Sequence, residues 1–139
     1  MIKFLIIFMS LFTGSLANSQ DTLDISNDNA NLPKLEFEKY SYDLGEVKKG
    51  EIKYFDIKFK NTGNVPIEID FVSSCDCTEV DFPYDEILPG QSGKLKVKFD
   101  SSSKEESETT DIDVFLKNKD PETGSQIYYT LEYSFTLTK

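Results

Sequence analysis

Cys75 and Cys77 are the residues of this chain best suited to carry chemistry, and Asp76 and Thr78 complete their Cys-Asp-Cys-Thr motif. The chain contains two cysteines, no histidine and no tryptophan. Two thiols can form a disulfide, exchange disulfides with another thiol compound or bind a soft metal ion. We therefore treat Cys75 and Cys77 as candidate redox or disulfide residues, and Asp76 and Thr78 as the remaining residues of the motif loop.

Three interpretations of the cysteine pair are open, and the first, which we favour, is structural. The cysteines would then be packed or disulfide-bonded at the end of the strand that follows Phe71. In an extended strand, residues i and i+2 point to the same side with Cα atoms about 6.6 Å apart, at the long end of the disulfide range. A disulfide would need a kink or bulge at Asp76. In the second interpretation, a strained, exposed disulfide is easily reduced, or bonds to another chain, and has a redox role.

The third interpretation, a metal site, lacks ligands. Zinc needs four ligands, and only carboxylates such as Asp76, Glu79 and Asp81 are close to the cysteines in the sequence. Two thiolates suit Cu(I), for which carboxylates are poor partners, although a dimer would supply further thiolates. We therefore expect no bound metal and no cofactor.

The composition also argues against an enzyme. Without histidine the chain has no Ser-His-Asp or Cys-His arrangement, and no side chain whose ordinary pKa lies near neutrality. No glycine-rich phosphate loop is present. The acidic residues are dispersed along the chain, which disfavours the paired carboxylates of a glycosidase.

Residues 1–17 are typical of a secretory signal peptide. Lys3 provides the basic start, residues 4–12 form an apolar run, and Ser15 and Ala17 are the small residues before the cleavage point. The apolar run is shorter than a membrane-spanning helix, so a membrane anchor is the less favoured alternative. We predict cleavage after Ala17, with no integral membrane segment in the mature form and a periplasmic or secreted location.

The predicted mature chain suits one domain. Cleavage leaves 139 − 17 = 122 residues and changes the formal net charge from −10 to −11, because the removed segment contains one lysine and no acid. Cleavage after Ser19 is an alternative. Such a charge opposes binding to nucleic acid, whose phosphates require cations. Residues 18–33 are polar and acidic, and we predict a disordered linker there.

From residue 34 onward, apolar residues recur at every second position, which is typical of strands with one buried and one solvated face. The main alternating runs lie at residues 35–44, 55–59, 65–71, 95–99, 112–116 and 129–137, separated by turn residues such as Asn61-Thr62-Gly63 and Pro89-Gly90. No segment has sustained helical periodicity. The pattern predicts an all-β fold, an immunoglobulin-like antiparallel β-sandwich of about seven strands over residues 34–139.

Lys94, Lys96 and Lys98 point to one face of a predicted strand. We interpret them as solvated lysines that protect a sheet from edge pairing, partly matched by Glu68 and Asp70 on another strand. A binding stripe is the alternative interpretation.

The order of short motifs resembles a bacterial domain-of-unknown-function family common in exported proteins of Bacteroidetes-like bacteria. The motifs are Phe59-Lys60-Asn61-Thr62-Gly63, Pro66-Ile67, Ser74-Cys75-Asp76-Cys77-Thr78, Ile87-Leu88-Pro89-Gly90-Gln91-Ser92-Gly93 and Val97-Lys98-Phe99-Asp100. Members of that family look like ASH/Hydin-type immunoglobulin-like domains, which are similar to the major-sperm-protein and pilus-chaperone class. The resemblance covers about residues 35–116 and implies fold and export, but no reaction.

The chain departs from the family pattern at two positions. Asp76 stands where the family usually has glycine between the cysteines, so a tight left-handed turn there would be strained. The family also tends to have a glycine-bearing turn after the strand that ends near Phe99. Here residues 101–107 (SSSKEES) predict a polar, mobile loop instead.

The sequence thus supports two functional hypotheses. The first is an exported, non-enzymatic binding or scaffolding module whose partner is an unidentified protein of the bacterial envelope. It would present loops or an open strand edge, with residues 75–80 and the long strand at 127–138 as the candidate surfaces. The second is a thiol-redox or copper-handling protein that uses Cys75 and Cys77. Fold resemblance alone also suggests a periplasmic chaperone.

Overall fold

The computed structural model describes residues 31–139, so the predicted signal peptide and most of the predicted linker lie outside the described residues. This part of the chain forms eight strands and one short 3-10 helix. The elements are β1 (Leu35–Phe37), β2 (Ser41–Lys48), β3 (Ile52–Asn61), β4 (Ile69–Ser73), β5 (Thr78–Asp81), β6 (Ser92–Asp100), η1 (Ser101–Ser103), β7 (Glu108–Lys119) and β8 (Gln126–Thr138).

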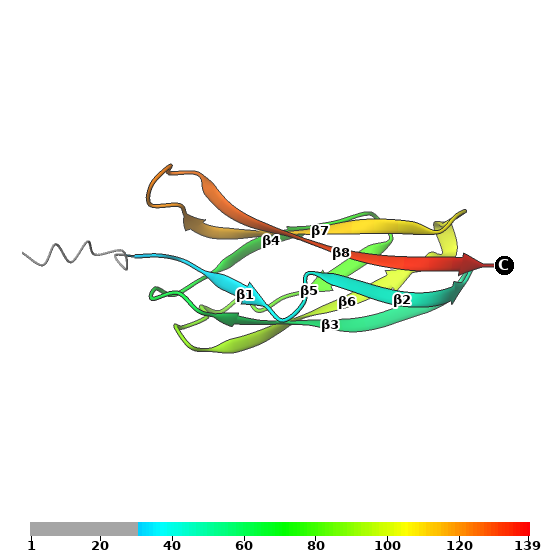
Figure 1. Ribbon diagram of the computed structural model, residues 1–139, viewed down its shortest axis with the longest axis horizontal. Helices are drawn as coiled ribbons and strands as arrows, with labels where there is room; N and C mark the ends of the chain where they lie inside the picture. Colours follow the sequence, from blue (N-terminus) through cyan, green and yellow to red (C-terminus); the bar gives the residue numbers. More distant parts are fainter. Residues whose placement is uncertain (1–30) are drawn as a thin grey trace, which may run out of the picture.

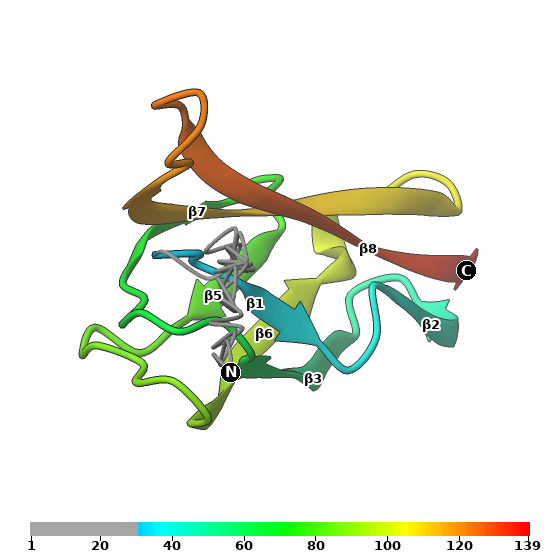
Figure 2. The ribbon, with the colours of Figure 1, turned by 60° about the vertical axis from the view of Figure 1, so that its left-hand side comes forward.

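The strands form two four-stranded sheets that pack face to face. One sheet has the order β1-β3-β6-β5 and the other the order β2-β8-β7-β4. Figures 1 and 2 show the sheet that contains β7 and β8 as one layer and the sheet that contains β3 and β6 as the other. The structure therefore confirms the predicted all-β, immunoglobulin-like sandwich.

The predicted run at residues 35–44 is divided between the two sheets. Residues 38–40 carry the chain from β1 in one sheet to β2 in the other. This crossing gives eight strands where we predicted about seven. The apolar positions move from Leu35 and Phe37 to Tyr40, Tyr42 and Leu44 across the crossing, a break in the period that marks the change of sheet.

The prediction that all strands run antiparallel is wrong for one pair. β2 lies parallel to β8, with Tyr42 beside Tyr133 and Val47 beside Leu137. The register between the two strands shifts between Asp43 and Glu46, where Gly45 has φ +68°. Because β2 enters its sheet from the opposite layer, it pairs with a strand far away in sequence rather than through a hairpin.

The core lies between the sheets and consists of the inward members of the alternating runs. Its largest fully buried side chains are Tyr133, Phe99, Leu35, Ile57, Ile67, Leu95, Ile112, Leu116, Leu131, Val47, Val97 and Val114. The Phe99 ring packs against the rings of Tyr133 and Phe135, with centroid distances of 5.2 Å and 4.6 Å. Burial of each large apolar side chain stabilises the fold by roughly 1.5–3 kcal/mol. A strand turned over by one residue would lose this energy, so burial fixes which face of each strand points inward.

The run predicted at residues 65–71 forms a strand only in its second half. β4 begins at Ile69, while Ile67 makes an isolated two-hydrogen-bond bridge to Ile87. The side-chain amide of Asn118 donates to the Pro66 carbonyl at 3.0 Å. Since proline has no N–H to donate to a neighbouring strand, pairing is interrupted at this end of the run.

Asn61, Gly63 and Gly93 of the family motifs hold the chain in place. Asn61 is fully buried, donates through Nδ2 to the Val65 and Ile87 carbonyls, and accepts through Oδ1 from the Gly63 N–H. A Cβ at Gly63 would lie 2.3 Å from the Leu32 carbonyl oxygen, and one at Gly93 would lie 2.7 Å from the Phe59 ring. These residues therefore serve the architecture by close approach and by buried hydrogen bonds.

The three lysines of β6 lie on a central strand, so the interpretation as edge protection is wrong. Lys94 Nζ lies 3.6 Å from Asp56 of β3, and Lys98 Nζ lies 3.8 Å from Glu79 of β5. Their acidic neighbours come from the two strands that flank β6, whereas Glu68 pairs with Lys117 across the other sheet.

We expect Asn61→Ala to lower the free energy of unfolding by roughly 2–4 kcal/mol, because two buried carbonyls lose their donor. Asn118→Ala is the matched control. Asn118 also bonds one carbonyl and one N–H, but in a setting that water can reach, so the expected loss is about 1 kcal/mol or less. Urea denaturation of both variants measures the difference, and equal losses would contradict this assignment.

Candidate functional site

The Cys75–Thr78 segment is the link between the two sheets, not part of a continuous strand. It follows β4 of one sheet and leads into β5 of the other. The Thr78 N–H donates to the Cys75 carbonyl at 3.0 Å, which closes a four-residue turn. The Asp100 N–H donates to the Cys77 carbonyl at 2.9 Å. The turn lies after the end of β4 and supplies the kink at Asp76 that a bond between the two cysteines was expected to need.

Cys75 and Cys77 are joined by a disulfide, with their Cα atoms 5.2 Å apart. The separation is shorter than in an extended strand because Asp76 and Cys77 lie in the turn. In the described part of the chain, Asn31 alone among non-glycine residues has a positive φ. Asp76 is therefore outside the left-handed region, and the turn does not require glycine at this position.

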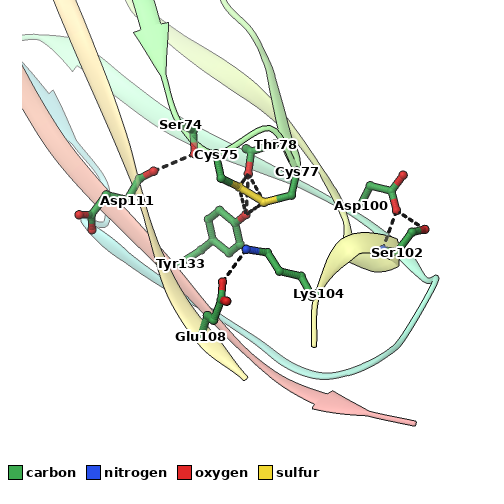
Figure 3. The surroundings of a disulfide bond; sticks show 10 residues. All are labelled: Ser74, Cys75, Cys77, Thr78, Asp100, Ser102, Lys104, Glu108, Asp111 and Tyr133. Carbon is green, nitrogen blue, oxygen red and sulfur yellow. Dashed lines mark hydrogen bonds and ion pairs between the residues drawn. A yellow bond between two sulfur atoms is a disulfide. The ribbon is translucent and has the colours of Figure 1, made fainter. Parts of the chain in front are cut away.

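Two hydroxyl groups lie beside the disulfide. Thr78 Oγ1 is 3.1 Å from Cys75 Sγ and 3.5 Å from Cys77 Sγ. The Tyr133 hydroxyl is 2.6 Å from Thr78 Oγ1, 3.7 Å from Cys77 Sγ and 3.9 Å from Cys75 Sγ. Figure 3 shows both hydroxyls pointing at the two sulfur atoms. The site therefore consists of two sulfurs and two hydroxyls that are connected by hydrogen bonds.

Tyr133 was not among the residues predicted for the site. It comes from β8, is completely buried, and its ring packs against Phe55 at 5.6 Å as well as against Phe99. In the sequence it is one more apolar position of an alternating run. Nothing in that pattern shows that its hydroxyl meets a motif 55 residues earlier.

The two cysteines differ in exposure to solvent. Cys77 is 8% exposed and belongs to the core, whereas Cys75 is partly buried and packs against the core. Within residues 31–139 no group of three or more histidine, cysteine or acidic side chains gathers as a metal site would need.

The segment predicted as a mobile loop begins with a short 3-10 helix that is hydrogen-bonded to the connection between β2 and β3. Residues 101–103 form η1, and the buried Ser101 hydroxyl donates to the Glu51 carbonyl at 2.8 Å. Asp100 caps η1 by accepting from the hydroxyl and the N–H of Ser102, and these hydrogen bonds lower the pKa of the Asp100 carboxyl. Lys104 and Glu108 form an ion pair, also drawn in Figure 3.

The main surface hollows of the described chain lie away from the cysteines. One, of about 310 Å³, is lined by the outward side chains of Glu36, Glu38, Lys58 and Lys60 around the Phe37 and Phe59 rings. The acids belong to the β1 side and the lysines to β3, and Thr62, Ser92 and Gly93 complete a lining that contains neither cysteine. It therefore adds no chemistry to the candidate site.

Residues 35–130 match the family described as "Protein of unknown function (DUF1573)". The chain belongs to this family. The assignment confirms the resemblance to a domain-of-unknown-function family. No curated protein matches the chain. No helix in the described DUF1573 chain is long and apolar enough to cross a membrane.

Solved structures confirm the fold of this DUF1573 member. A protein of unknown function from Porphyromonas gingivalis W83 aligns with a TM-score of 0.63 at 21% identity over 78% of the chain. The ASH/PapD-like domain 7 of human CEP192 aligns at 0.55, with 13% identity over 76% of the chain and 86% of that domain. The YadV chaperone aligns at 0.54, with 12% identity over 76% of the chain and 52% of its own. The chain spans 49% of the Porphyromonas protein.

We expect the double variant Cys75→Ser/Cys77→Ser to remain folded and to lose about 1.6 kcal/mol of stability, because the disulfide closes a loop of only three residues. Urea denaturation with circular dichroism measures the loss. A loss well above 4 kcal/mol, or loss of the β spectrum, would contradict a minor stabilising role.

Proposed function

We propose that this chain is a non-enzymatic binding module of the bacterial envelope that recognises an extended segment of another envelope protein. The segment would add as a further strand to the open edge of β4. The observation that carries this proposal is a row of three outward-facing aromatic rings, Phe71, Phe115 and Tyr128, that ends at this edge.

The topology limits where a strand can add. β4 is an edge strand of its sheet, as are β1, β2 and β5, so each has main-chain groups on one side that no strand of the described chain covers. β8, which the sequence suggested as a recognition surface, is covered by β7 along residues 126–135 and by β2 along residues 132–138, so a strand could add to it only beside residues 126–131. Residues 75–80 contribute only the first part of the short strand β5.

The aromatic row distinguishes β4 from the other edges. Phe71 stands opposite Phe115, and Phe115 opposite Tyr128, on the outer face of the sheet. The rings stack with centroid distances of 4.5 Å and 5.4 Å, and Phe71 and Tyr128 are 45% and 59% exposed. Phe115 covers one face of the Phe71 ring. Its other face is directed toward the open edge, where an added strand would place a side chain.

The chemistry of the edge defines the partner segment. An apolar or aromatic residue opposite Phe71 would extend the row, and such stacked pairs contribute about 0.5–1.5 kcal/mol beyond burial. Asp70, which accepts from Gln126 Nε2, is exposed beside Phe71, and the chain carries a net charge of −10. The favoured partner is therefore an extended segment with alternating apolar residues and flanking lysine or arginine.

Two sequence features support an envelope location. Residues 1–17 have the composition of an export signal, and a disulfide is stable in an oxidising compartment such as the periplasm. The absence of histidine leaves the family fold without the usual acid–base side chain of hydrolases, which supports a binding role over catalysis.

We expect peptides selected from a random display library on the purified protein to alternate apolar and polar residues and to carry basic charge. Phe71→Ala should weaken their binding at least tenfold, about 1.4 kcal/mol, by removing the ring that faces the added strand. Tyr54→Ala is the control, because Tyr54 is 73% exposed on the other sheet and should not affect binding. Titration calorimetry measures both variants.

Amide hydrogen exchange separates this mode from binding elsewhere. Binding of a selected peptide should slow exchange within residues 69–73 and leave β1 and β5 unchanged. Protection at another edge, or equal affinity for wild type and Phe71→Ala, would contradict the proposal. Sedimentation of the free protein as a dimer that Phe71→Ala dissociates would show that a second copy, and not another protein, occupies the edge.

A further inference from the structure

The disulfide contributes less to the fold than its place between the sheets suggests. It closes a three-residue loop, so it restricts the unfolded chain only slightly. β4 is held by its ladder to β7, and β5 by its ladder to β6. The turn also has its own hydrogen bond between the Thr78 N–H and the Cys75 carbonyl. Opening the disulfide therefore leaves both strands in place.

We propose that Cys75 and Cys77 form a thiol–disulfide exchange site, with Cys75 as the sulfur that meets the partner and Cys77 as the resolving sulfur. The proposal follows from the unequal exposure of the two cysteines and from the hydroxyl pair beside their sulfur atoms. The partner is a protein dithiol or disulfide. The proposal goes beyond the binding role at β4 and does not depend on it.

The exchange is balanced in sulfur and electrons. A partner thiolate attacks Cys75 Sγ, the Cys75–Cys77 bond breaks, and Cys77 Sγ leaves with the electron pair as a thiolate. The second partner thiol, as its thiolate, then attacks the partner sulfur of the mixed disulfide, and Cys75 leaves as a thiolate. The partner is oxidised to a disulfide, the cysteine pair is reduced, and the two partner protons are taken up by the new thiolates. In reverse, the reduced pair reduces a partner disulfide.

The hydroxyl pair can serve either thiolate. Thr78 Oγ1 and the Tyr133 hydroxyl are 2.6 Å apart, so one donates to the other, and the accepting hydroxyl still has its own hydrogen to donate. When Tyr133 donates to Thr78, Thr78 donates to Cys75 Sγ at 3.1 Å. When Thr78 donates to Tyr133, Tyr133 donates to Cys77 Sγ at 3.7 Å. Reversing the direction of the Thr78–Tyr133 hydrogen bond thus moves the stabilising donor from one cysteine thiolate to the other.

Core packing keeps this pair in position. The Tyr133 ring is fixed between Phe55 and Phe99, so its hydroxyl stays at the sulfur atoms while the disulfide opens and closes. Thr78 is the first residue of β5 and pairs with Phe99 of β6. Thr78 and Tyr133 are positioning residues in this scheme, and the sulfurs carry the reaction.

The unequal access is tested with two single-cysteine variants of the full chain. Cys77→Ser retains Cys75, Cys75→Ser retains Cys77, and both are treated with oxidised glutathione under native conditions and followed by intact mass. We expect Cys75 to form the mixed disulfide at least tenfold faster, and the two rates to converge in urea. Equal native rates, or a faster Cys77, would overturn the assignment of the attacked sulfur.

Reversibility is tested with the wild-type protein in glutathione buffers of graded potential. We expect the two cysteines to be reduced and reoxidised together while the circular-dichroism spectrum remains that of the folded protein. A disulfide that millimolar reduced glutathione opens only after unfolding by urea would overturn the proposal. Either result is independent of peptide binding at β4, which Phe71→Ala tests separately.

The hydroxyl contribution is tested through the pH dependence of Cys75 alkylation in the Cys77→Ser background. Thr78→Val removes the donor but keeps the shape, so the thiolate loses a hydrogen bond and the pKa of Cys75 should rise, moving the profile to higher pH. Thr78→Ser should restore the original profile. A purely structural threonine would not change the pH profile of Cys75 alkylation. A profile unchanged by Thr78→Val would therefore overturn the positioning role of this hydroxyl.

Discussion

Tyr133 connects the interior of the sandwich to the surface turn that bears both cysteines. Its ring is packed between aromatic side chains from the opposite sheet, and its hydroxyl ends beside Thr78 and the disulfide. The position of the sulfur site is therefore determined by the same face-to-face burial that holds the sheets together. A polar group in the core is tolerated because it has a hydrogen-bond partner at the point where the chain changes layers.

Asn61, Gly63 and Gly93 have structural roles, which explains why the short motifs that contain them indicate a fold more clearly than a reaction. Asn61 satisfies buried carbonyls, Gly63 permits close approach of the chain before β1, and Gly93 leaves space for a core ring. These tasks arise in any sandwich with this connectivity. The similar solved structures share the sandwich fold at low sequence identity. This is consistent with an architecture that is maintained by a few backbone and packing constraints.

Alternation of apolar residues was sufficient to predict an all-β sandwich because strand faces repeat every two residues and one face must be buried. It was not sufficient to assign strands to sheets. The run from Leu35 to Leu44 contains a single break in its period, between Phe37 and Tyr40, and that break does not show which sheet each half joins. β8 has the pattern of any half-buried strand although it lies inside its sheet. The cysteine motif was recognised, but its turn and the partner Tyr133 depend on contacts distant in sequence, which periodicity does not encode.

The parallel pairing of β2 with β8 also governs the order of folding events during synthesis. Ser41 and Glu132 are neighbours in the sheet although 91 positions separate them along the chain. A polypeptide that emerges with its amino end first cannot complete this ladder until almost the whole domain has arrived. Residues 41–48 remain without their neighbouring strand until then, so the fold closes late.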